Sequence, residues 1–113
     1  MLRNELDEAR ERYARLLDES LSRIVRSLAA LEEVQRVSVF GSYAAGRRDL
    51  LTDLDIFVVM DTAESYVDRL RRLYPMLSAP VDLDVVCYTP AEWQALRETP
   101  FLRRVGAARA RAV

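Results

Sequence analysis

The sequence of 113 residues contains no lysine and no histidine, so all seventeen basic side chains are arginines. Without histidine, the chain cannot build a Ser-His-Asp triad, a zinc site with histidine ligands or a histidine general base. Without lysine, a Schiff-base nucleophile and a phosphate-binding loop of the GxxxxGK[ST] type are also excluded. Any chemistry must therefore rest on carboxylates, arginines, hydroxyls and backbone amides.

Cysteine and long apolar runs are also scarce. Cys87 is the single cysteine, which excludes an intramolecular disulfide and a CxxC metal site. No apolar run approaches the ~18 residues of a membrane-spanning helix, and the charged N-terminus lacks the apolar core of a signal peptide. The net charge of −1 gives no electrostatic reason to expect direct nucleic-acid binding. We therefore expect a cytoplasmic protein with no membrane contact.

The length fits a single domain over residues 1–113 with one core. Apolar residues at steps of three and four predict a long amphipathic N-terminal helix within 1–33. Three short runs rich in β-branched residues, at 34–40, 54–60 and 81–88, predict strands. The fold class expected is α/β (α+β), with a small three-stranded mixed sheet flanked by helices.

Two capping signals follow the second and third strands. The residues DTAE at 61–64 predict a helix with Asp61 as its N-cap, ending near Tyr74 before Pro75. The residues TPAE at 89–92 predict another helix, with proline at its first position.

The N-terminal helix and the C-terminal segment both extend beyond what a small core requires. The first half of the N-terminal helix either frays beside the core or packs its spare apolar stripe against a partner or a second copy of the chain. Residues 97–113 hold five arginines against one glutamate, which predicts a basic C-terminal helical tail.

The second and third strands share an acidic start. Because side chains alternate between faces, one face of each strand is wholly apolar, whereas the other begins with two carboxylates. These are Asp53 and Asp55 in the second strand, and Asp82 and Asp84 in the third. If the strands are neighbours, the repulsion must be balanced by arginine or by a divalent metal, and an all-oxygen cluster suits Mg²⁺. The alternative is that the acids simply mark solvent-exposed strand ends.

The loop between the first two strands supplies the complementary groups. Gly41 allows the backbone to approach a ligand closely, and Ser42 offers a hydroxyl. The amides that follow point at an anion if a short helix begins here. Arg47 and Arg48 add positive charge, so the loop is suited to a phosphate-bearing ligand.

These residues together resemble the nucleotidyltransferase superfamily typified by DNA polymerase β. More narrowly, the chain resembles the minimal nucleotidyltransferases that pair with HEPN-domain proteins. The resemblance covers roughly residues 20–105 and implies the nucleotidyltransferase fold. The matching positions are Phe40-Gly41-Ser42, Gly46 and Thr52-Asp53-Leu54-Asp55-Ile56. Many relatives carry arginine where this loop has Ala45, so either triphosphate binding is weaker or Arg47 substitutes for the missing charge.

The resemblance also implies a set of roles. Asp53, Asp55 and Asp84 would bind two Mg²⁺ ions and form the catalytic centre, with ATP as the substrate. The spacing to the residues YTP favours Asp84 over Asp82 as the third acid, and Asp84 would also accept the proton of the attacking hydroxyl.

The same resemblance gives roles to the loop. Gly41 and Ser42 would contact the β- and γ-phosphates, and Arg47 or Arg48 would neutralise them.

The activity implied is transfer of AMP from ATP onto a hydroxyl of a partner protein, with a HEPN-family toxin as the partner that the transfer neutralises. One alternative is a nucleotide-binding module that neutralises its partner by occlusion. Another is a transferase acting on a different protein or on a small molecule.

Four further residues are assigned to packing rather than chemistry. Asp49 is interpreted as a loop or capping residue, and Tyr43 is expected to pack on the loop. Cys87 and Trp93 are expected to lie in the core and in helix packing.

Overall fold

A three-stranded mixed sheet forms the centre of the computed structural model, which describes residues 4–100. Strand β1 (Val34–Phe40) runs antiparallel to β2 (Leu54–Met60), and β3 (Leu83–Tyr88) runs parallel to β2, in the order β1-β2-β3. The predicted sheet is confirmed, although β3 begins two residues later than the sequence indicated.

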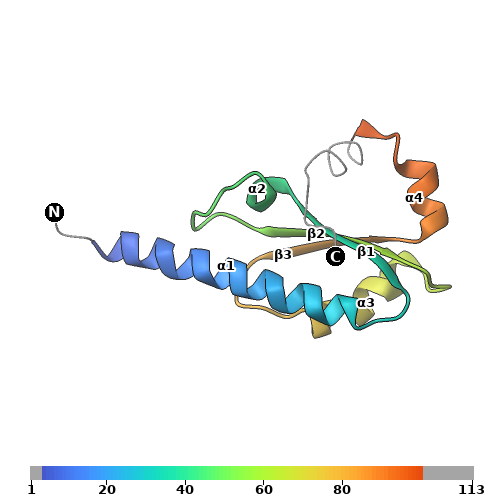
Figure 1. The fold of residues 1–113 in the computed structure, drawn as a ribbon, viewed down its shortest axis with the longest axis horizontal. Coiled ribbons are helices and arrows are strands. Elements are labelled where there is room, and N and C mark those ends of the chain that lie inside the picture. Colours follow the sequence, from blue (N-terminus) through green and yellow to red (C-terminus); the bar gives the residue numbers. More distant parts are fainter. Residues whose placement is uncertain (1–3, 101–113) are drawn as a thin grey trace.

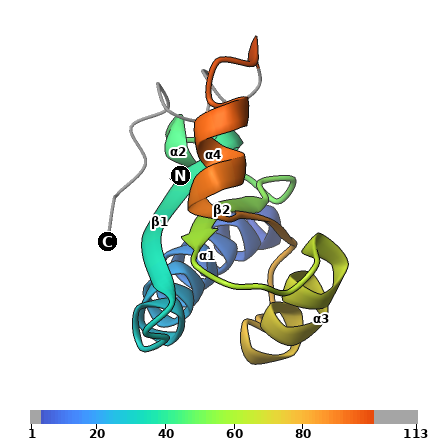
Figure 2. The same ribbon diagram turned by 90° about the vertical axis from the view of Figure 1, so that its right-hand side faces the viewer.

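Helices lie on both sides of this sheet. The long helix α1 (Glu5–Ala29) and α3 (Tyr66–Met76) lie on one side, whereas α2 (Gly41–Ala44) and α4 (Pro90–Leu96) lie on the other (Figures 1 and 2). Among the residues described, no helix is both long and apolar enough to cross a membrane.

The wholly apolar strand faces form the main core beneath the sheet. Every residue on that face of β2 is fully buried, and Val85 and Cys87 of β3 lie in the same cluster. The helices contribute four fully buried side chains from α1 and α3, together with others less completely enclosed: Leu17, Ile24, Leu28 and Leu73. The alternation predicted from the sequence is therefore confirmed, as is the packing role of Cys87.

A smaller apolar cluster lies on the opposite face of the sheet. Phe57 and Val59 are buried there, and the Trp93 ring of α4 packs edge-on to Phe57 with 5.0 Å between ring centroids. On this face of the sheet, the cluster lies beyond the acidic residues at the start of β2 and β3. Helix α4 therefore covers the far end of the sheet and does not cover the end that carries the acidic residues.

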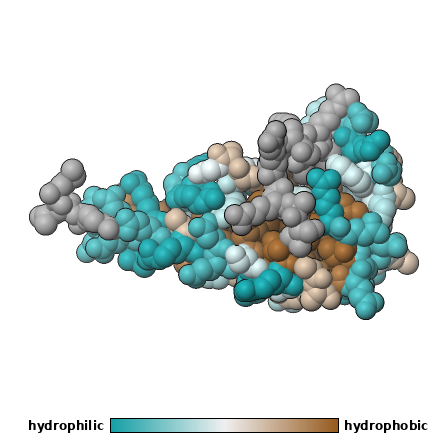
Figure 3. All heavy atoms as spheres, viewed as in Figure 1, coloured by the Kyte–Doolittle hydropathy of each residue, from teal (hydrophilic) through white to brown (hydrophobic). Residues whose placement is uncertain are grey.

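Helix α1 is longer than the sheet it covers. The Asn4 side chain accepts a hydrogen bond from the Asp7 amide and caps the helix, but the buried residues of α1 begin only at Leu17. The first half extends past the sheet (Figure 1), and its visible surface is mostly hydrophilic, whereas an apolar area lies farther along, near the sheet (Figure 3). The predicted long helix is confirmed, within narrower bounds than residues 1–33.

The predicted cap at Asp61 is wrong. The N-cap of α3 is Ser65, whose hydroxyl accepts from the Asp68 amide. Asp61 and Glu64 form no capping box, because the Asp61 amide donates to the Glu33 carbonyl at 2.8 Å and the Glu64 carboxylate binds the guanidinium of Arg72 at 2.6 Å.

The remaining helix ends differ in how well the sequence predicts them. Helix α3 passes through Pro75 and ends at Met76, because a proline so close to the C-terminus of a helix removes few hydrogen bonds. The capping box that opens α4 at Thr89 is present as predicted. Most of the predicted basic tail, residues 101–113, lies outside the described residues.

Candidate functional site

Asp55 and Asp84 occupy directly paired positions on the neighbouring parallel strands β2 and β3. Paired positions on adjacent strands are about 4.8 Å apart and present their side chains on the same face. The sheet therefore brings these two carboxylates side by side, at the end where β2 and β3 begin and β1 ends. We call this the acidic end of the sheet.

Asp55 lies in an unfavourable environment for a negative charge. Partial burial raises the pKa of its carboxyl, and the charges of Asp84 and Asp53 raise it further. Within the described residues, neither Asp55 nor Asp84 forms an ion pair with an arginine. Within residues 4–100, negative charge therefore gathers at Asp55 and Asp84 without an ion pair to balance it.

Gly41 lies against the carboxylate of Asp55. Its φ of +72° falls in the left-handed region, and a Cβ built at this position would be 2.2 Å from Asp55 Oδ2. A side chain at position 41 is therefore excluded both by backbone conformation and by contact. The expected short helix is present as α2, which begins at Gly41.

Asp82 and Asp53 lie near the first half of α1. The Tyr13 hydroxyl donates to the Thr52 carbonyl at 2.9 Å, and Asp82 lies close to Tyr13 on the neighbouring segment. Burial raises the pKa of Tyr13, and the charges of Asp82 and Asp53 raise it as well. Asp82 also lines a hollow of about 340 Å³ with Tyr13 and Leu50. The structure pairs Asp55 with Asp84, and Asp82 lies beside Tyr13.

The loop before β2 is organised by Asp49. Its carboxylate accepts from the Leu51 amide and the Thr52 hydroxyl, which confirms its interpretation as a loop residue. The same carboxylate binds the Arg47 guanidinium, which raises the pKa of Arg47 and lowers that of Asp49. The charge of Asp53 also acts on Arg47, so this arginine lies within electrostatic range of the acidic end.

Arg48 has contacts that hold it against α1. Its guanidinium lies over the Tyr43 ring at 3.5 Å from the centroid and donates to the Tyr43 carbonyl at 2.8 Å. Asp18 accepts a hydrogen bond from the Tyr43 hydroxyl and lies 3.5 Å from Arg48 Nε. Tyr43 is buried, so its expected packing role is confirmed. Phosphate binding by Arg48 stays a prediction, and these contacts favour a packing role.

The carboxylates at the acidic end indicate whether this part of the sheet could bind a metal ion. Within residues 4–100, no three acidic or cysteine side chains lie close enough together to form a ready-made metal site. The paired carboxylates of Asp55 and Asp84 do match Mg²⁺, which usually takes one or two carboxylates and completes its shell with water and substrate phosphates. A metal here would thus bind together with a triphosphate rather than alone.

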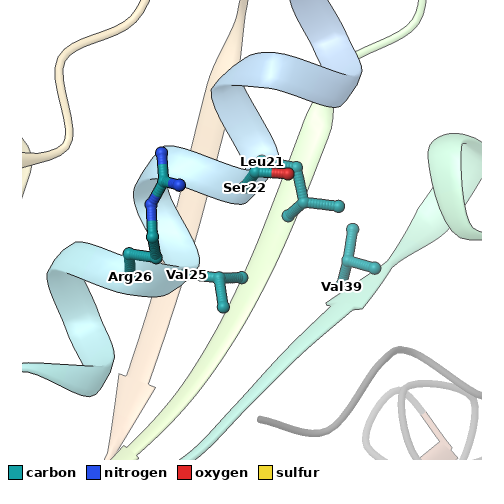
Figure 4. Close-up of a pocket in the computed structure, with 5 residues that line it drawn as sticks. All are labelled: Leu21, Ser22, Val25, Arg26 and Val39. Carbon is teal, nitrogen blue, oxygen red and sulfur yellow. The ribbon is translucent and has the colours of Figure 1, made fainter.

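A second hollow, of about 200 Å³, lies between α1 and β1 (Figure 4). Leu21, Val25 and Val39 form its walls, with Ser22 and Arg26 beside them. Arg26 is the one ionisable side chain among these residues, so the hollow offers no acid for proton transfer and no carboxylate for a metal.

Sequence reasoning missed Tyr13 and Asp18. Both precede the motif by more than twenty residues, and both lie in a segment whose periodicity predicts a helix but no functional role. Tyr13 was counted as part of the apolar stripe, and the charge of Asp18 is ordinary on a helix surface. No local signal predicts that they contact the loop.

Comparison with known proteins yields two matches. Residues 20–108 match the family model described as a nucleotidyltransferase domain. A crystal structure of a candidate nucleotidyltransferase from Sulfolobus solfataricus superimposes with a TM-score of 0.52 at 18% identity. The superposition covers 86% of this chain and 85% of that one, and at this identity it supports the fold alone. No curated protein matches the chain.

Proposed function

The chain belongs to the nucleotidyltransferase domain family, and on that premise we propose that it transfers AMP from ATP to a hydroxyl of a partner protein. The observation that carries this proposal is the pairing of Asp55 with Asp84 on adjacent strands, with Gly41 packed against Asp55. A carboxylate pair that forms no ion pair within the described part of the chain suits a metal-bound triphosphate.

Asp55 and Asp84, with Asp53 beside them, would hold Mg²⁺, and two ions are proposed. Bound divalent ions stabilise the entering and leaving oxygens of an in-line displacement at phosphorus. Burial and then the charges of Asp84 and Asp53 raise the pKa of Asp55, and a bound cation would offset both effects by stabilising the ionised carboxylate.

The other residues would bind and orient the reactants. The backbone at Gly41 and the Ser42 hydroxyl would contact the β- and γ-phosphates, and Arg47 would add positive charge. Asp84 would accept the proton of the acceptor hydroxyl as its oxygen bonds to the α-phosphorus and pyrophosphate leaves. The products are AMP-modified protein and pyrophosphate.

The partner proposed is a HEPN-family toxin, which the modification would inactivate. The support for this partner is the resemblance of the motif to minimal nucleotidyltransferases. The exposed Leu51 next to the motif adds an apolar contact for a docked protein, because its side chain is 77% exposed.

One observation favours a second function. The first half of α1 extends beyond the sheet, and Leu6 on it is 46% exposed. An exposed apolar side chain on a projecting helix suits contact with another chain, either a partner that is neutralised by occlusion or a second copy. Under this alternative, the nucleotide is a bound ligand rather than a substrate.

Calorimetric titration of ATP tests the site itself. With Mg²⁺ present, we expect binding to the wild type, and we expect no binding to the Asp53→Asn/Asp55→Asn double variant. Asp61→Asn, at the other end of β2, is the matched control and should bind normally. Absence of binding to the wild type would contradict the proposal.

A neutralisation assay separates the two functions. If transfer neutralises the toxin, the double variant loses protection, and mass spectrometry detects no AMP on the toxin. If occlusion neutralises it, the double variant still protects, and Leu6→Asp removes protection.

A further inference from the structure

The segment from Gly41 to Asp53 connects β1 to β2 and carries the motif at both of its ends. Regular structure covers only its first four residues, as α2. The rest of the segment, about ten residues, must be held by other contacts if the two ends are to keep a constant separation. Two side chains of α1 provide such contacts.

Tyr13 holds the C-terminal end of the segment. Its hydroxyl donates to the Thr52 carbonyl at 2.9 Å. Thr52 directly precedes Asp53, and the Leu54 amide that follows donates to the Asp82 carbonyl at 2.9 Å. Tyr13 therefore anchors the residues that lead into β2, and these bond directly to the residues that lead into β3.

Asp18 holds the N-terminal half of the segment. Its carboxylate accepts from the Tyr43 hydroxyl and lies 3.5 Å from Arg48 Nε, while Arg48 stacks on the Tyr43 ring. Tyr43 is 8% exposed and follows Gly41 and Ser42 in α2. Displacement of Tyr43 would therefore move the start of the motif as well.

The two contacts share one rigid support. Leu17, between Tyr13 and Asp18 on α1, is fully buried in the main core. We propose that Tyr13 and Asp18 are positioning residues, which fix the distance between the Gly41-Ser42 turn and the carboxylates of Asp53, Asp55 and Asp84. The consequence for nucleotide binding rests on the proposed function, whereas the anchoring itself is measurable without a nucleotide.

Sites that bind a metal and a triphosphate tolerate little displacement of their binding groups. Groups that bind a metal and a triphosphate must be held within a fraction of an ångström of the productive geometry, and their supporting hydrogen bonds contribute to affinity. Loss of one supporting hydrogen bond should weaken binding while the fold persists.

Tyr13→Phe tests the first contact, because it removes only the hydroxyl. Tyr66→Phe is the matched control, since Tyr66 is likewise partly buried and its ring packs 5.8 Å from that of Tyr88, at the end of β3 far from the acidic end. We expect Tyr13→Phe to weaken Mg²⁺–ATP binding roughly 3- to 10-fold and Tyr66→Phe to leave it unchanged.

The hydrogen-exchange rates of single backbone amides, measured without nucleotide, distinguish loss of this one contact from a general loss of stability. The Leu54 amide bonds to the Asp82 carbonyl and so reports the contact between the two lead-in segments. In Tyr13→Phe its exchange should become about 5-fold faster, while the Ile56 amide, farther into the sheet, should exchange as in the wild type.

Two substitutions of Asp18 test the second contact. Asp18→Asn can still accept the Tyr43 hydrogen bond and should bind Mg²⁺–ATP within about 2-fold of the wild type, whereas Asp18→Ala should bind several-fold more weakly. The inference is overturned if Tyr13→Phe matches Tyr66→Phe in both exchange and affinity, or if Asp18→Ala matches the wild type. If the wild type itself does not bind Mg²⁺–ATP, the proposed function fails, and the exchange of Leu54 alone supports or overturns the anchoring.

Discussion

At the scale of single residues, Gly41 illustrates how one missing side chain makes room for a carboxylate. Its positive φ and its contact with Asp55 are two independent reasons for glycine. Gly46 in the same loop also has a positive φ, of +98°, but open space surrounds its Cα. The two glycines therefore separate the effect of backbone strain from that of steric contact.

We expect Gly41→Ala to lose Mg²⁺–ATP binding and Gly46→Ala to retain it. Both substitutions should lower the free energy of unfolding by about 1–3 kcal/mol, because each forces a side chain into a left-handed conformation. Only Gly41→Ala also displaces the Asp55 carboxylate. Urea unfolding and calorimetric titration of both variants measure the two effects, and equal titrations would contradict the steric argument.

Asp55 gives a prediction about pH in the metal-free protein. Because burial and the charges of Asp84 and Asp53 raise its pKa in the folded state, this carboxyl favours folding only below its unfolded pKa of about 3.9. That contribution is lost as the pH rises through the folded pKa. At neutral pH the ionised carboxylate thus opposes folding.

Asp55→Asn should therefore raise the free energy of unfolding at pH 7 in the presence of a chelator. The gain should shrink as the pH falls and vanish below about pH 3.9. Urea unfolding across this range measures it, with Asp61→Asn controlling for the change in net charge. A constant gain at every pH would show that the effect is not electrostatic.

At the scale of elements, Arg69 joins α3 to β3 and α4. It is 4% exposed, donates to the carbonyls of Glu64 and Cys87, and forms a bidentate pair with Glu92 at 2.6 and 3.2 Å. Glu92 also completes the capping box of α4, so one arginine connects the end of β3 to the start of the helix that covers it.

Arg69→Met should lower the free energy of unfolding by about 2–4 kcal/mol, because the buried Cys87 carbonyl and the partly buried Glu64 carbonyl lose this donor and the Glu92 carboxylate loses its ion-pair partner. Arg71→Met on the same helix is the control, since Arg71 is 78% exposed and should change stability by less than about 0.5 kcal/mol. Denaturant unfolding of both variants provides the measurement. A similar loss in the two variants would refute the connecting role of Arg69.

At the scale of the whole molecule, the first half of α1 contributes far less to the core than the other elements do. The sheet, α3 and α4 are held by two apolar clusters, whereas no residue of α1 before Leu17 is buried. The first half of the helix is supported by its Asn4 cap and by charge pairs such as Arg10 with Asp7. Surface charge pairs contribute only a few tenths of a kcal/mol each, and an exposed Asn cap contributes about 0.5–1 kcal/mol.

Removal of residues 1–11 should therefore leave the fold intact, with a loss in the free energy of unfolding below about 1 kcal/mol. Tyr13 remains in this truncated chain, so Mg²⁺–ATP binding should persist. Neutralisation of a partner should be lost if this half of α1 is the contact surface. Unfolding, titration and the neutralisation assay provide the readouts, and loss of folding would show that the projecting half is part of the core.

The sequence by itself determined the strands, their apolar faces and the types of residue at the acidic end. Alternation along a strand and the capping box at Thr89 are local patterns, and each predicts its element without reference to the rest of the chain. The Gly41-Ser42 turn and the acids of the second strand were likewise recognisable from spacing, so the candidate site was largely predicted from the sequence.

Only the tertiary structure decided which of these groups meet. The parallel register of β2 with β3 places Asp84 beside Asp55, whereas Asp82 lies with Tyr13. Asp61 and Glu64 bond to Glu33 and Arg72 instead of to each other, and α3 begins after Ser65 rather than after Asp61 as the local pattern predicted. These contacts join residues far apart in the chain, and their energies depend on which surfaces packing brings together, which no local spacing records.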